Sequence, residues 1–193
     1  MSSVSRVSRL FPLFLKVDAR RVLVVGAGGV AEGKIAQLRE AGAEVHVVAP
    51  EATDAIGDLA TRGAVTWSAR AFDERDVDDA WLVVAATSDP EVQRRASNAA
   101  DARRIFCIAV DDLPNGSAYS GAIVRRDPFT IAISSSADAP ALTRLLREIL
   151  EQVLPEEEWV DAAKELRAKW KRDHVPMASR FAELVREFKM RAR

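Results

Sequence analysis

A glycine-rich stretch near the start of the chain has the residue types and spacing that bind the phosphates of a dinucleotide. It reads RVLVVGAGGVAEGK over residues 21–34 and contains a GxGxxA pattern. In such a pattern, Gly26 allows a tight turn out of a strand, Gly28 lets a pyrophosphate approach the backbone, and Ala31 lets the helix pack closely. Free N–H groups at the start of that helix would face the phosphates. We expect a nicotinamide cofactor, although the same turn also occurs in α/β proteins that bind none.

A competing pattern in this stretch is rejected. Gly28 to Lys34 also fits GxxxxGK, the start of a nucleoside triphosphate loop. Ile35 follows, where such a loop needs Ser or Thr to hold magnesium. A triphosphate-binding loop is therefore excluded.

The choice between NAD and NADP depends on the end of the second expected strand, Glu44–Ala49. The acid that usually binds the ribose hydroxyls would lie at its tip. Pro50 is not an acid, whereas Glu51 is close enough to be a candidate. Glu51 would more commonly lie in the first turn of the next helix, beside its positive dipole end. No arginine follows to meet a 2′-phosphate, so we prefer NAD.

Asp111 is the candidate for proton transfer. It directly follows the apolar run Ile105–Val110, which we expect to be a strand. Ligands of open α/β sheets bind beyond the carboxyl ends of the strands. A carboxylate there can face the nicotinamide and accept or hold a proton. The alternative is that Asp111 and Asp112 only form a turn.

Serines and arginines further along the chain form a candidate anion site. Ser134, Ser135 and Ser136 precede an expected helix, and they either cap it or bind an anion with their hydroxyls and free amides. Arg144 and Arg147 lie three residues apart on that helix. These two side chains could contact carboxylates of a substrate.

Composition narrows the class of protein. The 193 residues carry a net charge of −1, which gives no general attraction for nucleic acid. The single cysteine, Cys107, excludes an internal disulfide, and no residue spacing predicts a metal site. No apolar run reaches the ~20 residues that cross a membrane, so we expect a cytoplasmic protein. Ten Lys and Arg against five Asp and Glu over residues 159–193 indicate either a solvated helical face or attraction of an anionic ligand.

Strand and helix patterns alternate up to residue 110. This alternation predicts an α/β fold, a Rossmann-type doubly wound parallel sheet with helices on both faces, with a short opening strand at Leu13–Val17. The strands expected at 118–124 and 129–134 would form a hairpin whose edge seeks a partner chain. We therefore expect three parts: an NAD-binding domain over 1–112, a β dimerisation region over 113–140 and a helical domain over 141–193.

The chain as a whole resembles a known family. The segments LFPLFLKVDARRVLVVGAGGVAEGK, RRIFCIAVDDLP, AIVRRDPFTIAISSS and APALTRLLREILE occur in the order found in precorrin-2 dehydrogenases, the NAD-binding module of siroheme synthases. The resemblance implies a homodimer that oxidises precorrin-2 to sirohydrochlorin with NAD. Some members of that family also insert ferrous iron to give siroheme, and others do not.

The resemblance also implies roles for particular residues. The essential aspartate of the family matches Asp111, and a serine that is phosphorylated in some members matches Ser135. Precorrin-2 carries many carboxylates, which suits Arg144 and Arg147. The cofactor contacts of the family match two residues of the glycine turn and two after the second strand: Gly29, Val30, Pro50 and Glu51.

Two other functions stay open. One is a non-catalytic dimeric regulator that binds NAD or a tetrapyrrole. The other is a dehydrogenase for a different small substrate, which would share the glycine turn but would not explain the ordered match beyond Asp111.

Overall fold

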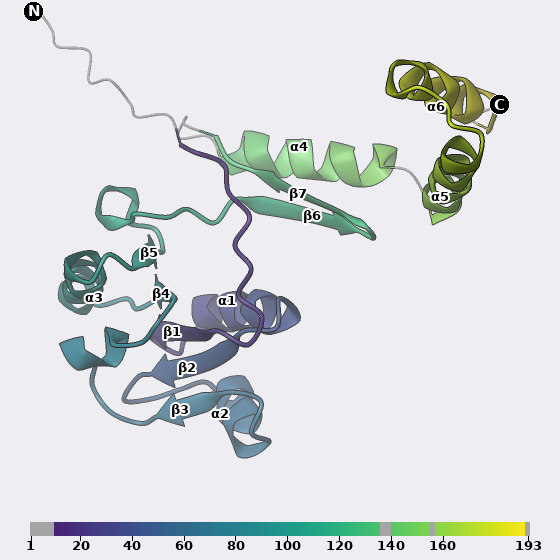
Figure 1. Ribbon diagram of the computed structural model, residues 1–193. Helices are drawn as coiled ribbons and strands as arrows, with labels where there is room; N and C mark the ends of the chain where they lie inside the picture. The colour runs from purple at the N-terminus through teal and green to yellow at the C-terminus, as the bar shows by residue number, and fades with distance from the viewer. Residues whose placement is uncertain (1–9, 136–139, 155–156, 192–193) are drawn as a thin grey trace, which may run out of the picture. The chain divides into compact units, whose positions relative to one another are not determined.

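The computed structural model of the chain describes residues 10–135, 140–154 and 157–191 (Figure 1). The chain forms two compact units, Met1–Ser120 and Gly121–Arg193. The predicted division into three parts at 112 and 140 stays a prediction. None of the helices in the described ranges combines the length and the low charge that crossing a bilayer requires.

The first unit is a parallel sheet with the strand order β3-β2-β1-β4-β5. The expected Rossmann-type α/β fold is therefore confirmed. Between its strands run three α-helices and a short 3-10 helix, and a second 3-10 helix follows the last strand. The elements are β1 (Arg21–Val25), α1 (Gly29–Glu40), β2 (Glu44–Val48), α2 (Asp54–Thr61), β3 (Thr66–Ser68), η1 (Glu74–Val77), β4 (Leu82–Ala85), α3 (Pro90–Ala102), β5 (Phe106–Ala109) and η2 (Leu113–Asn115).

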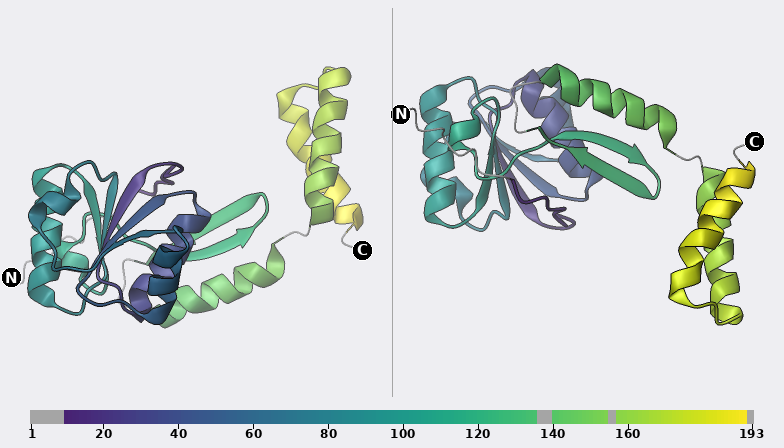
Figure 2. Two further views of the ribbon diagram at one scale, coloured as in Figure 1. Left: turned by 90° about the horizontal axis from the view of Figure 1, so that it is seen from below. Right: turned by 90° about the horizontal axis from the view of Figure 1, so that it is seen from above.

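Two apolar layers cover this sheet, because successive side chains of a strand point to opposite faces. Val22 and Val24 of β1 pack with Ile35 of α1 and with residues of α2. Leu23 and Val25 point the other way and pack with alanines of α3. Figure 2 shows α1 and α2 on one side of the sheet and α3 on the other. This arrangement explains why β1 is a continuous apolar run.

The second unit begins with an antiparallel pair, β6 (Ala122–Arg126) and β7 (Phe129–Ile133). Helix α4 (Pro140–Val153) packs on this hairpin, and Arg126 donates hydrogen bonds to the carbonyls of Glu151 and Leu154, both at 2.7 Å. Helices α5 (Glu157–Arg172) and α6 (Met177–Arg191) pack together through stacked rings of Trp159 and Phe188, 4.5 Å apart.

Two predictions of secondary structure were wrong. Leu13–Val17 forms no strand, because no neighbouring strand pairs with it, and within this segment Val17 alone is buried in the core. Helix α2 begins at Asp54 with Thr53 as its N-cap, so Glu51 lies before the helix and not in its first turn.

Candidate functional site

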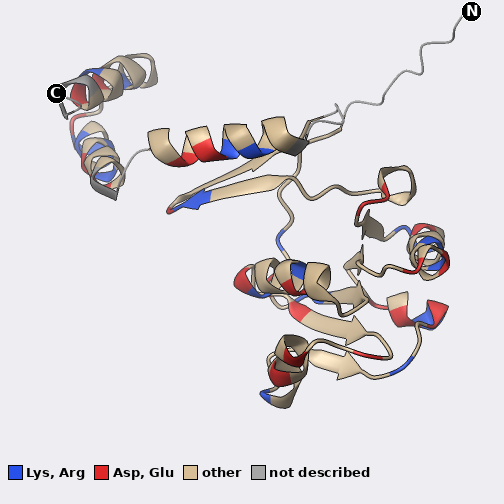
Figure 3. Ribbon diagram, turned by 180° about the vertical axis from the view of Figure 1, so that it is seen from behind, with Lys and Arg blue, Asp and Glu red and all other residues tan. Residues whose placement is uncertain are grey.

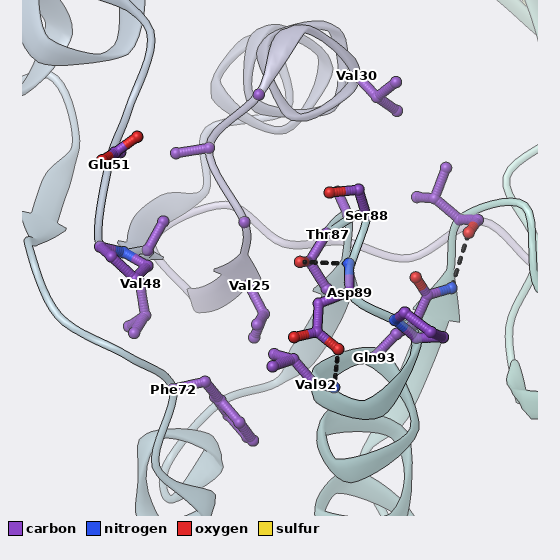
Figure 4. A pocket seen from close by; sticks show the side chains of 18 of the residues that line it. Val25, Val30, Val48, Glu51, Phe72, Thr87, Ser88, Asp89, Val92 and Gln93 are labelled. Carbon is purple, nitrogen blue, oxygen red and sulfur yellow. Dashed lines mark hydrogen bonds between the residues drawn. The ribbon is translucent and has the colours of Figure 1, made fainter.

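The carboxyl ends of the parallel strands surround a cavity of about 1080 Å³ (Figure 4). Its walls come from the ends of β1, β2, β4 and β5 and from the segments that follow them. Strand β1 lies between β2 and β4, so the chain leaves β1 toward one side of the sheet first and returns to the other side later. Such a reversal of strand order is where open α/β sheets bind ligands.

The glycine turn forms the middle of the cavity wall. Gly26 has φ +103°, and a Cβ added there would run into the carbonyl of Ala86, so both the backbone and the close packing require glycine. A Cβ on Gly28 or Gly29 would meet nothing within 4 Å. The space over these two residues is therefore open to a ligand group.

Helix α1 starts beside this open space. Its N-cap is Gly28, which has no side chain to satisfy the first N–H groups of the helix. Ala31 is fully buried against the sheet, as the small third residue of the pattern requires. The turn thus offers free N–H groups, a helix dipole and room for a pyrophosphate, and these residues fit a dinucleotide.

The residues after β2 form one side of the cavity. Pro50 and Glu51 line it, and the exposed Glu51 is available to a ribose hydroxyl because it is not part of α2. The backbone N–H of Thr53 donates to the carbonyl of Ala27 at 3.1 Å, which ties this segment to the glycine turn. The hydroxyl oxygen of Thr53 is buried and has no hydrogen-bond partner in the described structure.

The segments after β4 and β5 form the other side. Three polar residues follow β4 and line the cavity: Thr87, Ser88 and Asp89. Asp89 caps α3 by accepting hydrogen bonds from the N–H groups of Glu91 and Val92.

Asp111 follows β5 and lines the cavity with an exposed side chain. Its φ is +58°, a left-handed conformation that aspartate and asparagine tolerate better than most residues.

Two residues near Asp111 were missed by the sequence analysis. Gln93 of α3 lines the cavity, and its Nε2 donates to the carbonyl of Val110 at 2.8 Å. Helical spacing puts Gln93 on the face of α3 that also carries the buried Ala96, Ser97 and Ala100, and this was the available signal.

Lys34 is the second missed residue, because the sequence pattern points to it only as part of the rejected triphosphate loop. Its Nζ donates a hydrogen bond to the hydroxyl of Ser120. Burial lowers the pKa of Lys34, and the negative charge of Asp111 acts in the opposite direction and raises it. A half-buried cation is thus placed within electrostatic range of Asp111.

The remaining predicted site residues belong to the second unit. Ser134 and Ser135 are exposed, and the hydroxyl of Ser135 accepts a hydrogen bond from Thr143 at 3.1 Å.

The two predicted arginines of α4 form ion pairs within the helix. Arg144 pairs with Glu148 at 2.9 Å, and Arg147 pairs with Glu151. Figure 3 shows the acidic and basic residues side by side along α4. Ser136 lies outside the described residues, and a role of this group in substrate binding stays a prediction.

The described residues contain no group of three or more His, Cys, Asp or Glu side chains placed to hold a metal ion. Cys107 is buried, and burial raises the pKa of its thiol. This thiol contacts the hydroxyl of Ser97 at 3.5 Å, so it is a core residue rather than a reactive one.

Comparison with known proteins gives matches to most of the chain. A family described as "Putative NAD(P)-binding" matches residues 13–122. A protein named siroheme synthase 1 from Cronobacter sakazakii is 47% identical over 144 residues, which are 75% of this chain and 31% of that protein. Siroheme synthase from Salmonella paratyphi A is 40% identical over 171 residues, 88% of this chain and 37% of that protein. The chain therefore spans about a third of the length of these curated relatives.

A solved structure described as "SirC, precorrin-2 dehydrogenase" has the same fold. It matches with a TM-score of 0.72 and 23% sequence identity, over 92% of this chain and 88% of that one. The likeness extends over both units, so the small antiparallel sheet and the helices that follow belong to a fold seen before.

Proposed function

Because the chain belongs to the "Putative NAD(P)-binding" family, we propose that it is an NAD-dependent dehydrogenase that oxidises precorrin-2 to sirohydrochlorin. The observation that carries this proposal is the cavity. Its lining includes the open glycine turn, Glu51, which could bind a ribose hydroxyl, and Asp111, which follows β5. NAD is preferred over NADP because Glu51, a hydrogen-bond acceptor for ribose hydroxyls, follows β2 and would repel a 2′-phosphate.

The chemistry divides between the cofactor and the chain. When bound, the nicotinamide cofactor accepts a hydride from the substrate. The oxidation also releases a proton, and Asp111, exposed at the cavity, is our candidate to accept or steer it. The glycine turn and the start of α1 would hold the pyrophosphate of a bound cofactor, on the wall of the same cavity that Asp111 lines.

The choice of substrate is supported by the relatives. Two siroheme synthases are 47% and 40% identical to the matched parts of this chain, and a protein described as a precorrin-2 dehydrogenase has its fold. Precorrin-2 is a polyanion, for which Arg144 and Arg147 of α4 are candidate partners. Each arginine now pairs with a glutamate four residues on, so a substrate carboxylate would compete with Glu148 or Glu151.

A homodimer is part of this proposal. Helix α4 leaves a row of large apolar residues exposed at helical spacing, although the hairpin covers part of its surface. A contiguous apolar face of this kind marks an interaction surface. We propose that a second copy of the chain covers it. The exposed residues are Leu142, Leu145, Leu146, Ile149 and Val153.

The experiment is an anaerobic assay of the purified protein with precorrin-2 and NAD, followed by absorbance. We expect the sirohydrochlorin spectrum to appear together with an equal amount of NADH. Adding ferrous iron afterwards tests iron insertion, which stays a prediction, as does the cytoplasmic location. Absence of any spectral change in folded protein that binds NAD would reject the dehydrogenase and favour the non-catalytic regulator or another substrate.

A further inference from the structure

Gln93 is a buried polar residue in the wall of the cavity. It is 5% exposed and lies on α3 among small residues that pack against the sheet. Buried amides almost always find hydrogen-bond partners, because an unpaired one loses its hydration without compensation. The partner of its NH₂ group and the surroundings of its oxygen therefore indicate the role of Gln93.

The orientation of the amide follows from its one side-chain hydrogen bond in the described structure. Nε2 lies 2.8 Å from the carbonyl oxygen of Val110. A carbonyl can only accept, so the NH₂ group must face Val110 and the amide oxygen must face away. Figure 4 shows the oxygen of Gln93 on the side away from this bond. No hydrogen bond to this oxygen is found among the described residues, and Gln93 lines the cavity.

The half of the cofactor that reaches Gln93 follows from the sheet. The pyrophosphate belongs at the glycine turn, and the ribose of the adenosine half belongs at the tip of β2, beside Glu51. Gln93 lies on the opposite side of the turn, at the ends of β4 and β5 (Figure 4). The nicotinamide half must extend to that side. Its carboxamide is a hydrogen-bond donor that could meet an unpaired amide oxygen.

We propose that Gln93 is a specificity-determining residue: its amide oxygen accepts a hydrogen bond from the nicotinamide carboxamide, while its NH₂ group holds Val110. This inference rests on the proposed function and assigns a further residue to it. The two bonds have one geometric consequence. Gln93 joins the nicotinamide to the residue directly before Asp111, so the ring and the carboxylate are positioned from a single side chain.

The proposal predicts a preference between dinucleotides. Nicotinic acid adenine dinucleotide has a carboxylate in place of the carboxamide, so it would face the oxygen of Gln93 with another acceptor. ADP-ribose lacks the ring altogether. An acceptor that loses its water to a ligand and stays unpaired discriminates strongly, so wild-type protein should bind NAD at least about tenfold more tightly than nicotinic acid adenine dinucleotide.

The test measures the dissociation constants of these three ligands by calorimetry for wild-type protein, Gln93→Met and Gln93→Asn. Methionine has a similar length and cannot replace the amide. In Gln93→Met we expect the preference for NAD over the carboxylate analogue to fall to less than about threefold, with ADP-ribose binding unchanged. Ser97→Ala is the matched control, because Ser97 is equally buried on the same face of α3 and contacts Cys107 instead. It should keep the wild-type preference.

Each outcome has one meaning. A preference that survives in Gln93→Met, or affinities for all three ligands that fall together, would overturn the proposal, because Gln93 would then have no direct role or only a structural one. If Gln93→Met does not fold, the wild-type ratio and Gln93→Asn decide. The proposal for Gln93 would be overturned if wild-type protein bound NAD and its carboxylate analogue equally well. It would also be overturned if the shorter Gln93→Asn kept the full preference.

These results are distinct from a failure of the proposed function. Wild-type protein that binds ADP-ribose without preferring NAD over the carboxylate analogue leaves the proposed function standing. Folded protein that binds no dinucleotide rejects that function itself.

Discussion

Strand β1 of the first unit and helix α4 of the second are both rich in large apolar residues, but they bury them to different extents. Val22 to Val25 are at most 1% exposed, because helices cover both faces of the sheet. On α4, Leu145 is 51% exposed and Ile149 is 45% exposed. The apolar side chains of β1 are therefore buried within one chain, whereas the apolar face of α4 is not.

This difference indicates where each unit gets its stability and what it contributes. The cofactor cavity lies in the first unit, at the ends of strands that two buried apolar layers cover. Among the described residues of the second unit, few apolar side chains are buried, and these include Val124, Ala162 and Trp170. An exposed apolar face costs about 25 cal/mol for each Å² left in water. We infer that dimerisation completes the second unit and that cofactor binding needs the first alone.

The largest expected effect is on chemistry in the first unit. Asp111→Asn should lower kcat by about 10²- to 10⁴-fold, because asparagine cannot accept the proton. NAD affinity and folding should persist, since asparagine tolerates the left-handed φ of +58°. The rate is followed as NADH formation with precorrin-2.

A matched control exists for Asp111. Asp79 is another aspartate with positive φ, +65°, and it does not line the cavity. Asp79→Asn should keep the wild-type rate. An Asp111→Asn enzyme with undiminished kcat would remove Asp111 from the mechanism.

The next effect is on the second unit. Leu145→Glu should weaken the dimer roughly 100-fold, because about 1.4 kcal/mol would be lost from each of two copies. Sedimentation velocity at a series of concentrations measures this. NAD binding by the first unit should be unchanged. A dimer of wild-type strength in this variant would show that the apolar face of α4 is not the interface.

Acid stability depends on Asp76 in the first unit. Hydrogen bonds from Arg70 lower the pKa of this carboxyl, so the folded protein holds it ionised to lower pH than the unfolded chain does. Its contribution is therefore complete above the unfolded value of about 3.8 and is lost as the pH falls through the folded value.

Asp76→Asn should lower the free energy of unfolding by about 1 kcal/mol at pH 7. The difference from wild type should shrink below about pH 4. Chemical denaturation at both pH values tests this prediction. A difference that grows as the pH falls would contradict the assigned direction.

The smallest expected effect is on stability at Arg144. Its ion pair with Glu148 is exposed, so Arg144→Gln should change the free energy of unfolding by less than about 0.5 kcal/mol. If Arg144 contacts a substrate carboxylate, the KM for precorrin-2 should rise while the affinity for NAD stays constant. An unchanged KM would remove Arg144 from the substrate site.

Local patterns carried most of the prediction for the first unit. The apolar run at Val22 and the glycines after it determine a strand, a turn and a helix start from neighbouring residues alone, and the structure has all three. Leu13–Val17 was wrong because an apolar run becomes a strand only if another strand pairs with it. Glu51 was assigned to a helix that begins three residues later, at Asp54.

The two site residues that the sequence did not predict, Gln93 and Lys34, are recognised by contacts between segments that lie apart in the sequence. Gln93 acts on Val110, 17 residues away, and Lys34 on Ser120, 86 residues away. Neither contact follows from spacing in the sequence. The burial of α4 could not be predicted either, since its apolar face has the same periodicity whether a core or another chain covers it.

The most direct test is a calorimetric titration with NAD of wild-type protein, Leu145→Glu and Gly28→Leu. A leucine at Gly28 should keep the fold, because the backbone there is extended and an added Cβ meets nothing within 4 Å, and its side chain should fill the space over the turn. We predict one NAD per chain with equal affinity in wild type and Leu145→Glu, and at least about tenfold weaker binding in Gly28→Leu. Folded wild-type protein that binds no NAD, or Gly28→Leu that binds it as tightly as wild type, would contradict the account.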